Sequence, residues 1–224
     1  VYETVERLRR ELPTPVALIG FAGAPWTLAT YMIEGRGGRD FGKVRRWADT
    51  GESFAALIDL LVDAVTDHLT AQINHGAEAV QLFDSWAGVL SESQFWRWVI
   101  EPTKEIVRRL GEACPGVPVI GFPRGAGALY ADFVRETGVA AVSLDSGVPL
   151  SWAAEVLQPI CTVQGNLDNL ALIAGGDLMV SEVRRILDVL SAGPFVFNLG
   201  HGVLPDTPAQ HVADLVALVR GGSS

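Results

Sequence analysis

The chain has 224 residues, of which 49% are hydrophobic, and carries a formal net charge of −9 at pH 7. This acidic balance argues against sequence-independent nucleic-acid binding, which needs a basic face, and no apolar run reaches the roughly 18 residues of a membrane-spanning helix. The two cysteines, Cys114 and Cys161, lack CxxC spacing and give neither a disulfide framework nor a zinc ligand set. We therefore expect a protein of the reducing cytoplasm with no metal.

The chain opens with an amphipathic stretch, Val1–Leu12, that predicts a helix. Because a domain of alternating strands and helices seldom begins with the helix before its first strand, we expect further sequence upstream. A short apolar run, Val16–Ile19, then predicts a buried strand. It leads into GFAGAPWTLATYMIEG (Gly20–Gly35), where the glycines predict a tight turn, Pro25 opens a helix and Tyr31 lies on that helix.

Two arginines, Arg36 and Arg39, lie among glycines in Glu34–Asp40. We interpret this segment as a solvated loop, with a mobile lid or a carboxylate clamp as the alternative. The clearest helix is Glu52–His75, whose apolar residues fall at three- and four-residue steps. Ala79–Phe83 predicts the next strand, which runs into the sequence DSWAG.

The second half of the chain continues the alternation of helices and strands. Ser91–Leu110 predicts a helix that starts with a capping box, is kinked at Pro102 and stops before Gly111. The remaining predicted strands are Val117–Gly121, Ala140–Leu144, Thr162–Gln164 and Phe195–Asn198. The helices that follow them are Leu129–Glu136, Ser151–Leu157, Ser181–Leu190 and a last one that opens at Thr207 and ends at Gly221, with residues 221–224 as a flexible tail.

Strands that alternate with helices predict an α/β fold with a parallel sheet. Two architectures compete, the open doubly wound sheet and the TIM-type (β/α)8 barrel. The strand ends GFAG, FDSWAG, FPRGAG, LDSG, QGNLD and NLGHG all place glycine beside polar or aromatic residues, which favours a barrel because a barrel recruits many strand ends to one mouth. We predict about six βα units of a single barrel domain over residues 1–224, with the first two of the eight units missing.

No phosphate-binding loop, GxGxxG, HExxH or GxSxG motif is present, so nucleotide, zinc-protease and serine-hydrolase functions are disfavoured. A general acid or base has to come from Tyr31, Asp84, Asp145, Asp168 or His201. His201 stands out because it lies between glycines just after an apolar strand. For Asp145 and Asp168 we favour a structural role, capping the next helix or tying loops together.

Four segments carry a family resemblance: GFAGAPWTLATYMIEG, QLFDSWAG, VQGNLD and FNLGHGVLPDTP. With them the chain resembles the uroporphyrinogen decarboxylase family of haem biosynthesis, in its bacterial form. The resemblance implies a (β/α)8 barrel, a homodimer, and catalysis without metal or organic cofactor. It also implies the reaction, which is stepwise removal of CO₂ from the four acetate side chains of uroporphyrinogen III to give coproporphyrinogen III.

The resemblance also implies the site residues. Tyr31, Ser85 and His201 match residues that contact the substrate's carboxylate side chains, and Phe21 and Phe83 match aromatics that pack on the macrocycle. The family's catalytic arginine and aspartate are expected upstream of this chain, so no catalytic residue is assigned within it.

Beside the resemblance, Arg124 follows a predicted strand and is a candidate to bind a substrate propionate, with pairing to a nearby aspartate as the alternative. Two other functions stay open. One is a zinc-dependent corrinoid:thiol methyltransferase of the same barrel superfamily, although no cysteine follows GFPRG where the zinc-bound thiol would be expected. The other is a porphyrin-binding fragment without catalytic activity.

Overall fold

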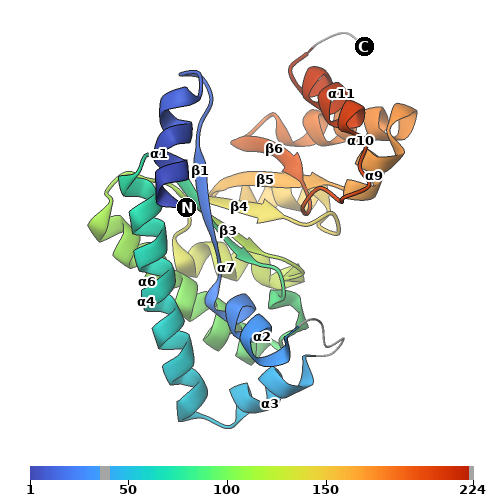
Figure 1. Cartoon of the computed structure of the whole chain (residues 1–224). Coiled ribbons are helices and arrows are strands. Elements are labelled where there is room, and N and C mark those ends of the chain that lie inside the picture. The colour runs from blue at the N-terminus through green and yellow to red at the C-terminus, as the bar shows by residue number, and fades with distance from the viewer. Residues whose placement is uncertain (36–40, 222–224) are drawn as a thin grey trace. The chain divides into compact units, whose positions relative to one another are not determined.

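The computed structural model describes residues 1–35 and 41–221. Its contacts divide the chain into two compact units, Val1–Ala140 (unit 1) and Ala141–Ser224 (unit 2), and each unit combines parallel strands with helices (Figure 1). The α/β class and the six strands predicted from the sequence are confirmed. The single-domain organisation stays a prediction. Arg36 and Arg39, together with residues 222–224 of the predicted tail, lie outside the described residues.

Unit 1 carries the first three strands. In chain order its elements are α1 (Tyr2–Glu11), β1 (Ile19–Gly23), α2 (Pro25–Glu34), α3 (Gly42–Asp49), α4 (Glu52–Asn74), β2 (Ala79–Asp84), η1 (Ala87–Val89), α5 (Glu92–Phe95), η2 (Trp96–Ile100), α6 (Glu101–Ala113), β3 (Val119–Pro123), η3 (Gly127–Leu129) and α7 (Tyr130–Thr137). The strands are parallel and β2 lies between β1 and β3, so their carboxyl ends meet at one edge.

Unit 2 carries the other three strands. Its elements are β4 (Ala141–Leu144), α8 (Leu150–Trp152), η4 (Ala153–Leu157), β5 (Thr162–Leu167), α9 (Asn169–Ala174), α10 (Gly176–Leu190), β6 (Phe195–Leu199) and α11 (Ala209–Val219). Here β5 lies between β4 and β6, again in parallel. Within residues 1–35 and 41–221, every helix is too short or too polar to cross a lipid bilayer.

Strand β1 is displaced from its prediction. It begins at Ile19 rather than Val16 and contains Gly20, which was expected in a turn. A Cβ on Gly20 would lie 2.9 Å from Gln72 Oε1, so the glycine lets the strand pack closely on α4. The Gln72 side chain also bonds both backbone groups of Phe21, accepting from its N–H at 3.0 Å and donating to its carbonyl at 2.9 Å.

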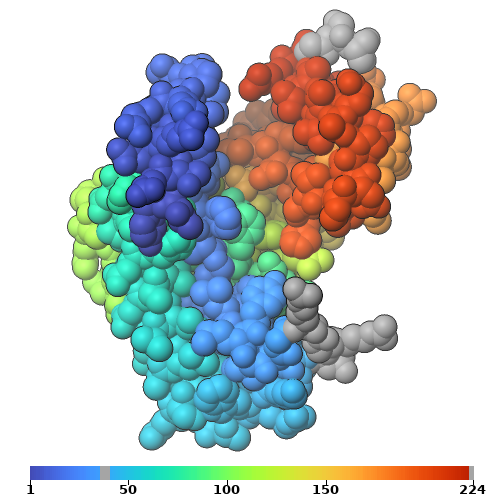
Figure 2. All heavy atoms as spheres, in the orientation of Figure 1, coloured from blue at the N-terminus to red at the C-terminus, as the bar shows by residue number. Residues whose placement is uncertain are grey.

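Helix α1 is confirmed where the sequence predicts it, and it packs on α4. The Tyr2 hydroxyl hydrogen-bonds His68 Nδ1 at 3.0 Å, and the Tyr2 ring stacks on His75 with centroids 5.4 Å apart. In the space-filling view, the dark blue atoms of α1 lie beside turquoise atoms of α4 (Figure 2). Helix α4 itself matches the predicted helix to within one residue at its end.

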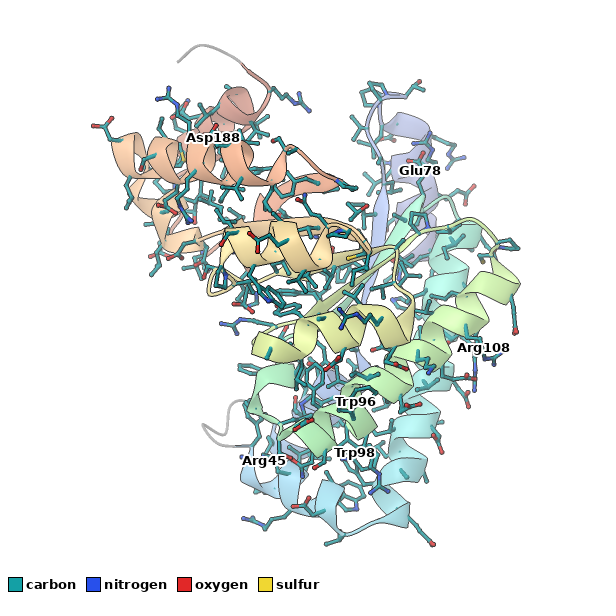
Figure 3. All side chains as sticks on the ribbon, turned by 180° about the vertical axis from the view of Figure 1, so that it is seen from behind. Arg45, Glu78, Trp96, Trp98, Arg108 and Asp188 are labelled. Carbon is teal, nitrogen blue, oxygen red and sulfur yellow. The ribbon has the colours of Figure 1, made fainter. Side chains whose placement is uncertain are left out.

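The helix predicted over Ser91–Leu110 is interrupted. Five residues, Trp96–Ile100, form a π-helix directly before α6, in whose first turn Pro102 lies; Figure 3 labels Trp96 and Trp98 on this segment. The kink at Pro102 stays a prediction, and what the structure has just before this proline is a π-helical segment; proline removes one hydrogen bond of the ordinary ladder. The capping box is wrong, because Ser91 makes no capping hydrogen bond, and α6 runs past Gly111 to Ala113.

The core of unit 1 between α2, α4 and η2 contains a cluster of aromatic side chains. Trp26 and Phe54 are fully buried with ring centroids 6.0 Å apart, and Trp98 meets Phe54 edge-on at 4.8 Å. Because Trp26 lies in the first turn of α2, this cluster fixes the beginning of that helix against α4 and η2. Helix α2 also carries Tyr31, so the packing of this core positions the helix that bears a candidate site residue.

Candidate functional site

Phenylalanines form a row across the three strands of unit 1. The register pairs Gly23 with Phe83 and Phe83 with Phe122, and Phe21 lies two positions before Gly23, on the same face. Phe83 meets Phe21 edge-on at 5.9 Å and Phe122 edge-on at 6.0 Å. The exposure of the rings increases along the row, from 2% for Phe122 to 62% for Phe21. It offers an apolar surface at the carboxyl half of the strands.

Two hydroxyl side chains lie near the carboxyl end of β2. Tyr31 is 52% exposed on α2, and its ring meets the Trp86 ring edge-on with centroids 6.5 Å apart. Ser85, which is partly buried, immediately precedes Trp86 in the turn after β2. Within the described part of the chain, neither hydroxyl makes a hydrogen bond, so both can donate one to a ligand.

A buried carboxyl group directly precedes Ser85 in the chain. Asp84 ends β2, is 3% exposed, and accepts a hydrogen bond from Thr27 Oγ1 at 2.5 Å. Burial raises the pKa of Asp84 from 3.8 to about 7, although the hydrogen bonds from Thr27 act in the opposite direction. Its second oxygen, Oδ2, has no hydrogen-bond partner among the described residues. The sequence includes Asp84 among the possible acids or bases, but it cannot reveal Thr27 as its partner.

The turns after β2 and β3 are fastened together. The Arg124 backbone N–H donates to the Asp84 carbonyl at 3.1 Å, and the Gly88 N–H donates to the Arg124 carbonyl at 3.0 Å. A Cβ on Gly88 would lie 2.8 Å from the Gly125 carbonyl oxygen, so only glycine allows this approach. Arg124 is partly exposed, and within residues 1–35 and 41–221 it forms no ion pair, so the predicted alternative of pairing with an aspartate is not observed.

His201 belongs to unit 2, where it is exposed just after the carboxyl end of β6. Gly200 holds this turn in place, because its N–H donates to the Leu167 carbonyl at 2.7 Å and a Cβ on it would lie 2.5 Å from the Ser146 nitrogen. The turn after β6 is therefore packed against the turn after β4. The structure brings Phe21, Tyr31, Phe83 and Ser85 to one region of unit 1. That His201 of unit 2 binds the same ligand as these residues stays a prediction.

The two other aspartates have the structural roles that we favour from the sequence. Asp168 caps α9 by accepting from the Leu170 N–H at 2.9 Å, and Asp145 Oδ1 accepts from the Gly147 N–H at 3.0 Å. The sequence pattern does not single out Asn166, whose side-chain amide donates to the carbonyls of Asp145 and Val148. These bonds stiffen the loop after β4.

Cysteine chemistry bears on the methyltransferase alternative. Cys114 is buried, and burial raises the pKa of the Cys161 thiol to about 11, which opposes the thiolate form that binds zinc. The described residues contain no cluster of three or more His, Cys, Asp or Glu side chains suited to a metal ion.

Comparison with known proteins gives one consistent family. The sequence model of the family "Uroporphyrinogen decarboxylase (URO-D)" matches residues 1–222. A uroporphyrinogen decarboxylase of Rhodospirillum rubrum is 59% identical over 221 residues, which is 98% of this chain and 64% of the relative. Another, from Rhizorhabdus wittichii, is 53% identical over 99% of this chain and 64% of its own length. The chain thus spans slightly less than two thirds of these relatives.

Solved structures show a similar fold at low sequence identity. A methyltransferase from Methanosarcina mazei superposes with a TM-score of 0.82 at 17% identity, covering 98% of this chain and 63% of that protein. A B12-independent methionine synthase from Shewanella sp. W3-18-1 gives a TM-score of 0.64 at 12% identity, covering 99% of this chain and 64% of that protein. These likenesses concern the fold alone, and they agree with an α/β chain that forms part of a barrel.

Proposed function

This chain belongs to the uroporphyrinogen decarboxylase family, and we propose that it serves the decarboxylation of uroporphyrinogen III. In this reaction the four acetate side chains become the methyl groups of coproporphyrinogen III. The observation that carries the proposal is the region of unit 1 where the phenylalanine row lies near two hydroxyls that have no partner among the described residues. An apolar face and separate donors suit a macrocycle that bears carboxylates on its rim.

Each step of the reaction is simple in outline. A proton added to the ring carbon next to the acetate makes the pyrrole cationic, the bond to the carboxylate breaks, and its electron pair flows into the ring as CO₂ leaves. A second proton completes the methyl group, and the ring carbon then returns its proton. The step requires a proton donor and an anion that stabilises the cationic ring, in a site that excludes water.

Within this reaction we assign binding roles to the residues of this chain. Phe21 and Phe83 pack against the macrocycle, while Tyr31 and Ser85 donate hydrogen bonds to substrate carboxylates. His201 adds a third donor from unit 2. Fixing the carboxylates orients one acetate at a time towards the proton donor, which is the contribution that positioning makes to the rate. The proton donor and the stabilising anion are expected from residues outside this sequence.

Further properties belong to the same proposal. Arg124 supplies positive charge for a substrate propionate, because it is partly exposed and its backbone is fixed beside Asp84. The enzyme works as a homodimer in the cytoplasm, and it uses no metal or organic cofactor. Light scattering of the purified protein at several concentrations measures the oligomeric state directly.

The proposal is tested with a chimera in which this chain replaces the matched residues of the Rhodospirillum rubrum relative. Uroporphyrinogen III is supplied without oxygen, and the products are oxidised and separated by their number of carboxyl groups. We expect porphyrins with seven, six, five and finally four carboxyl groups. The unaltered relative is the positive control. The negative control is the chimera that carries the substitutions Tyr31→Phe, Ser85→Ala and His201→Asn.

Two results would contradict the proposal. A folded chimera that releases no CO₂, beside an active relative, removes the decarboxylase function from this chain. If that chimera still binds uroporphyrin, the non-catalytic porphyrin-binding alternative takes its place. A fully active triple variant would instead leave the reaction standing and remove the site assignment.

A further inference from the structure

Asp84 is unusual among the carboxyl groups of unit 1, because its side chain is buried and forms no ion pair. Only one of its oxygens has a hydrogen-bond partner among the described residues, the Thr27 hydroxyl. Burying a carboxyl group without a cation is costly, and a buried polar atom without a partner requires an explanation. Burial raises the pKa of Asp84 to about 7, which favours the neutral form and reduces this cost.

The partner of Asp84 lies on the helix that carries Tyr31. Thr27 and Tyr31 are four residues apart on α2, and so lie on the same face of the helix. Asp84 directly precedes Ser85 in the turn after β2. The hydrogen bond between Thr27 and Asp84 therefore joins the two segments that hold the substrate-binding hydroxyls.

Trp86 strengthens the same junction. Its backbone N–H donates to Thr27 Oγ1 at 3.3 Å, and its carbonyl accepts from Trp26 Nε1 at 3.0 Å. Its ring packs between Phe41, with centroids 4.7 Å apart, and Tyr31, with centroids 6.5 Å apart. A single hydroxyl, that of Thr27, thus accepts a bond from the turn and donates one to Asp84. We therefore expect a change at Thr27 to weaken the attachment of the turn to α2, which the bond from Trp26 then holds alone.

We propose that Thr27 and Asp84 form a positioning pair, whose hydrogen bond fixes the helix bearing Tyr31 against the turn bearing Ser85. The pair acts through these two residues and does not touch the substrate. This inference rests on the proposed function for the roles of Tyr31 and Ser85, but the positioning itself can be measured without a ligand.

The ligand-free test follows the Tyr31 ring. The chain has three tyrosines, so labelling with 3-fluorotyrosine gives three fluorine resonances, and Tyr31→Phe identifies one of them. Thr27→Val keeps the shape of the side chain but removes its donor and acceptor. We expect this variant to shift or broaden the Tyr31 resonance while those of Tyr2 and Tyr130 stay in place, and we expect Thr27→Ser to restore the original spectrum.

The chain offers a matched control for this substitution. Thr66 on α4 is also buried, at 8% exposure, and its hydroxyl has no partner among the described residues. Thr66→Val makes the same chemical change outside the positioning pair, so we expect the Tyr31 resonance to stay unchanged. A Tyr31 resonance that is also unchanged in Thr27→Val overturns the proposal.

The second test measures affinity for uroporphyrin III by fluorescence titration of the 224-residue chain. We expect Thr27→Val to weaken binding about three- to tenfold, the effect of one net hydrogen bond, and Asp84→Ala to weaken it by a similar factor. In a Tyr31→Phe, Ser85→Ala background the same change should have little further effect, because the groups that it positions are gone.

The outcomes separate this proposal from the proposed function. An equal loss of affinity in both backgrounds means that Thr27 acts through general stability and overturns the positioning role. A chain that binds no uroporphyrin contradicts the proposed function, whereas the fluorine spectra still decide whether Thr27 and Asp84 position Tyr31.

Discussion

At the scale of single residues, Asp84 links the candidate site to the stability of the protein. Its pKa is about 7 in the folded protein and is taken as the ordinary 3.8 in the unfolded chain. Between these values the folded protein keeps a proton that the unfolded chain loses, so the free energy of unfolding falls as the pH rises. A shift of about three pKa units corresponds to roughly 4 kcal/mol over this interval.

Asp84→Asn removes the titration and keeps a similar shape. We expect the free energy of unfolding of the variant, relative to that of the original chain, to increase from pH 4 to pH 7 and then to level off. Denaturant titrations at unit pH steps measure this difference, with Thr66→Val as a variant that should run parallel to the original. Parallel curves for Asp84→Asn as well would mean that this carboxyl group does not titrate as its burial suggests.

At the scale of elements, glycine decides how β1 packs. A Cβ on Gly20 would lie 2.9 Å from Gln72 Oε1 and 3.2 Å from Ala77 Cβ, so Gly20→Ala forces the strand away from α4. We expect a loss of roughly 1–3 kcal/mol in the free energy of unfolding. Gly111 is the matched control, because it lies inside α6 and an added Cβ would meet nothing within 4 Å beyond the helix's own backbone.

For Gly111→Ala we expect a gain of about 0.5–1 kcal/mol, since alanine favours the helix and restricts the unfolded chain. Denaturant titrations of both variants give the comparison. Equal effects at the two positions would show that the close contact between β1 and α4 does not limit the side chain at Gly20.

The elements also show what the sequence can and cannot predict. Periodic apolar residues locate α4 almost to the residue, because a long helix with one buried face leaves a repeating pattern. The ends of β1 and β5 are less predictable: both strands continue through glycines that resemble turn residues, and only the contact of Gly20 with Gln72 explains why β1 does so. The capping box at Ser91 fails because Gln94 donates to Asp49 instead of folding back on its own helix.

The candidate site divides in the same way. Tyr31 and His201 are candidates from the sequence pattern itself, because each follows a predicted strand in a segment with glycines. Ser85, Phe21 and Phe83 were identified only through the family resemblance, and the local surroundings of all five residues in unit 1 or unit 2 came from the structure. The pairing of Thr27 with Asp84 joins residues 57 positions apart, and no local pattern in one sequence encodes such a contact.

At the scale of the whole molecule, the proposed function assigns substrate contacts to Tyr31 of unit 1 and His201 of unit 2. Uroporphyrin carries carboxylates around its entire rim, so donors from separate turns can hold a single molecule. We therefore predict one uroporphyrin for each chain, and about three- to tenfold weaker binding for His201→Asn, as for Tyr31→Phe. Fluorescence titration gives both the affinity and the stoichiometry.

His68→Asn serves as the control for this prediction, because His68 lies on α4 and bonds the Tyr2 hydroxyl rather than standing at a strand end. The affinity of this variant for uroporphyrin should equal that of the original chain.

The decisive comparison is between His201→Asn and Tyr31→Phe. If only Tyr31→Phe weakens binding, unit 1 binds the porphyrin without the turn after β6. Two porphyrins per chain, each lost with one of the variants, would mean that the units carry separate sites. A single stoichiometric site weakened by both variants is the result that a shared macrocycle requires, since one ligand must then contact a phenol and an imidazole far apart in the sequence.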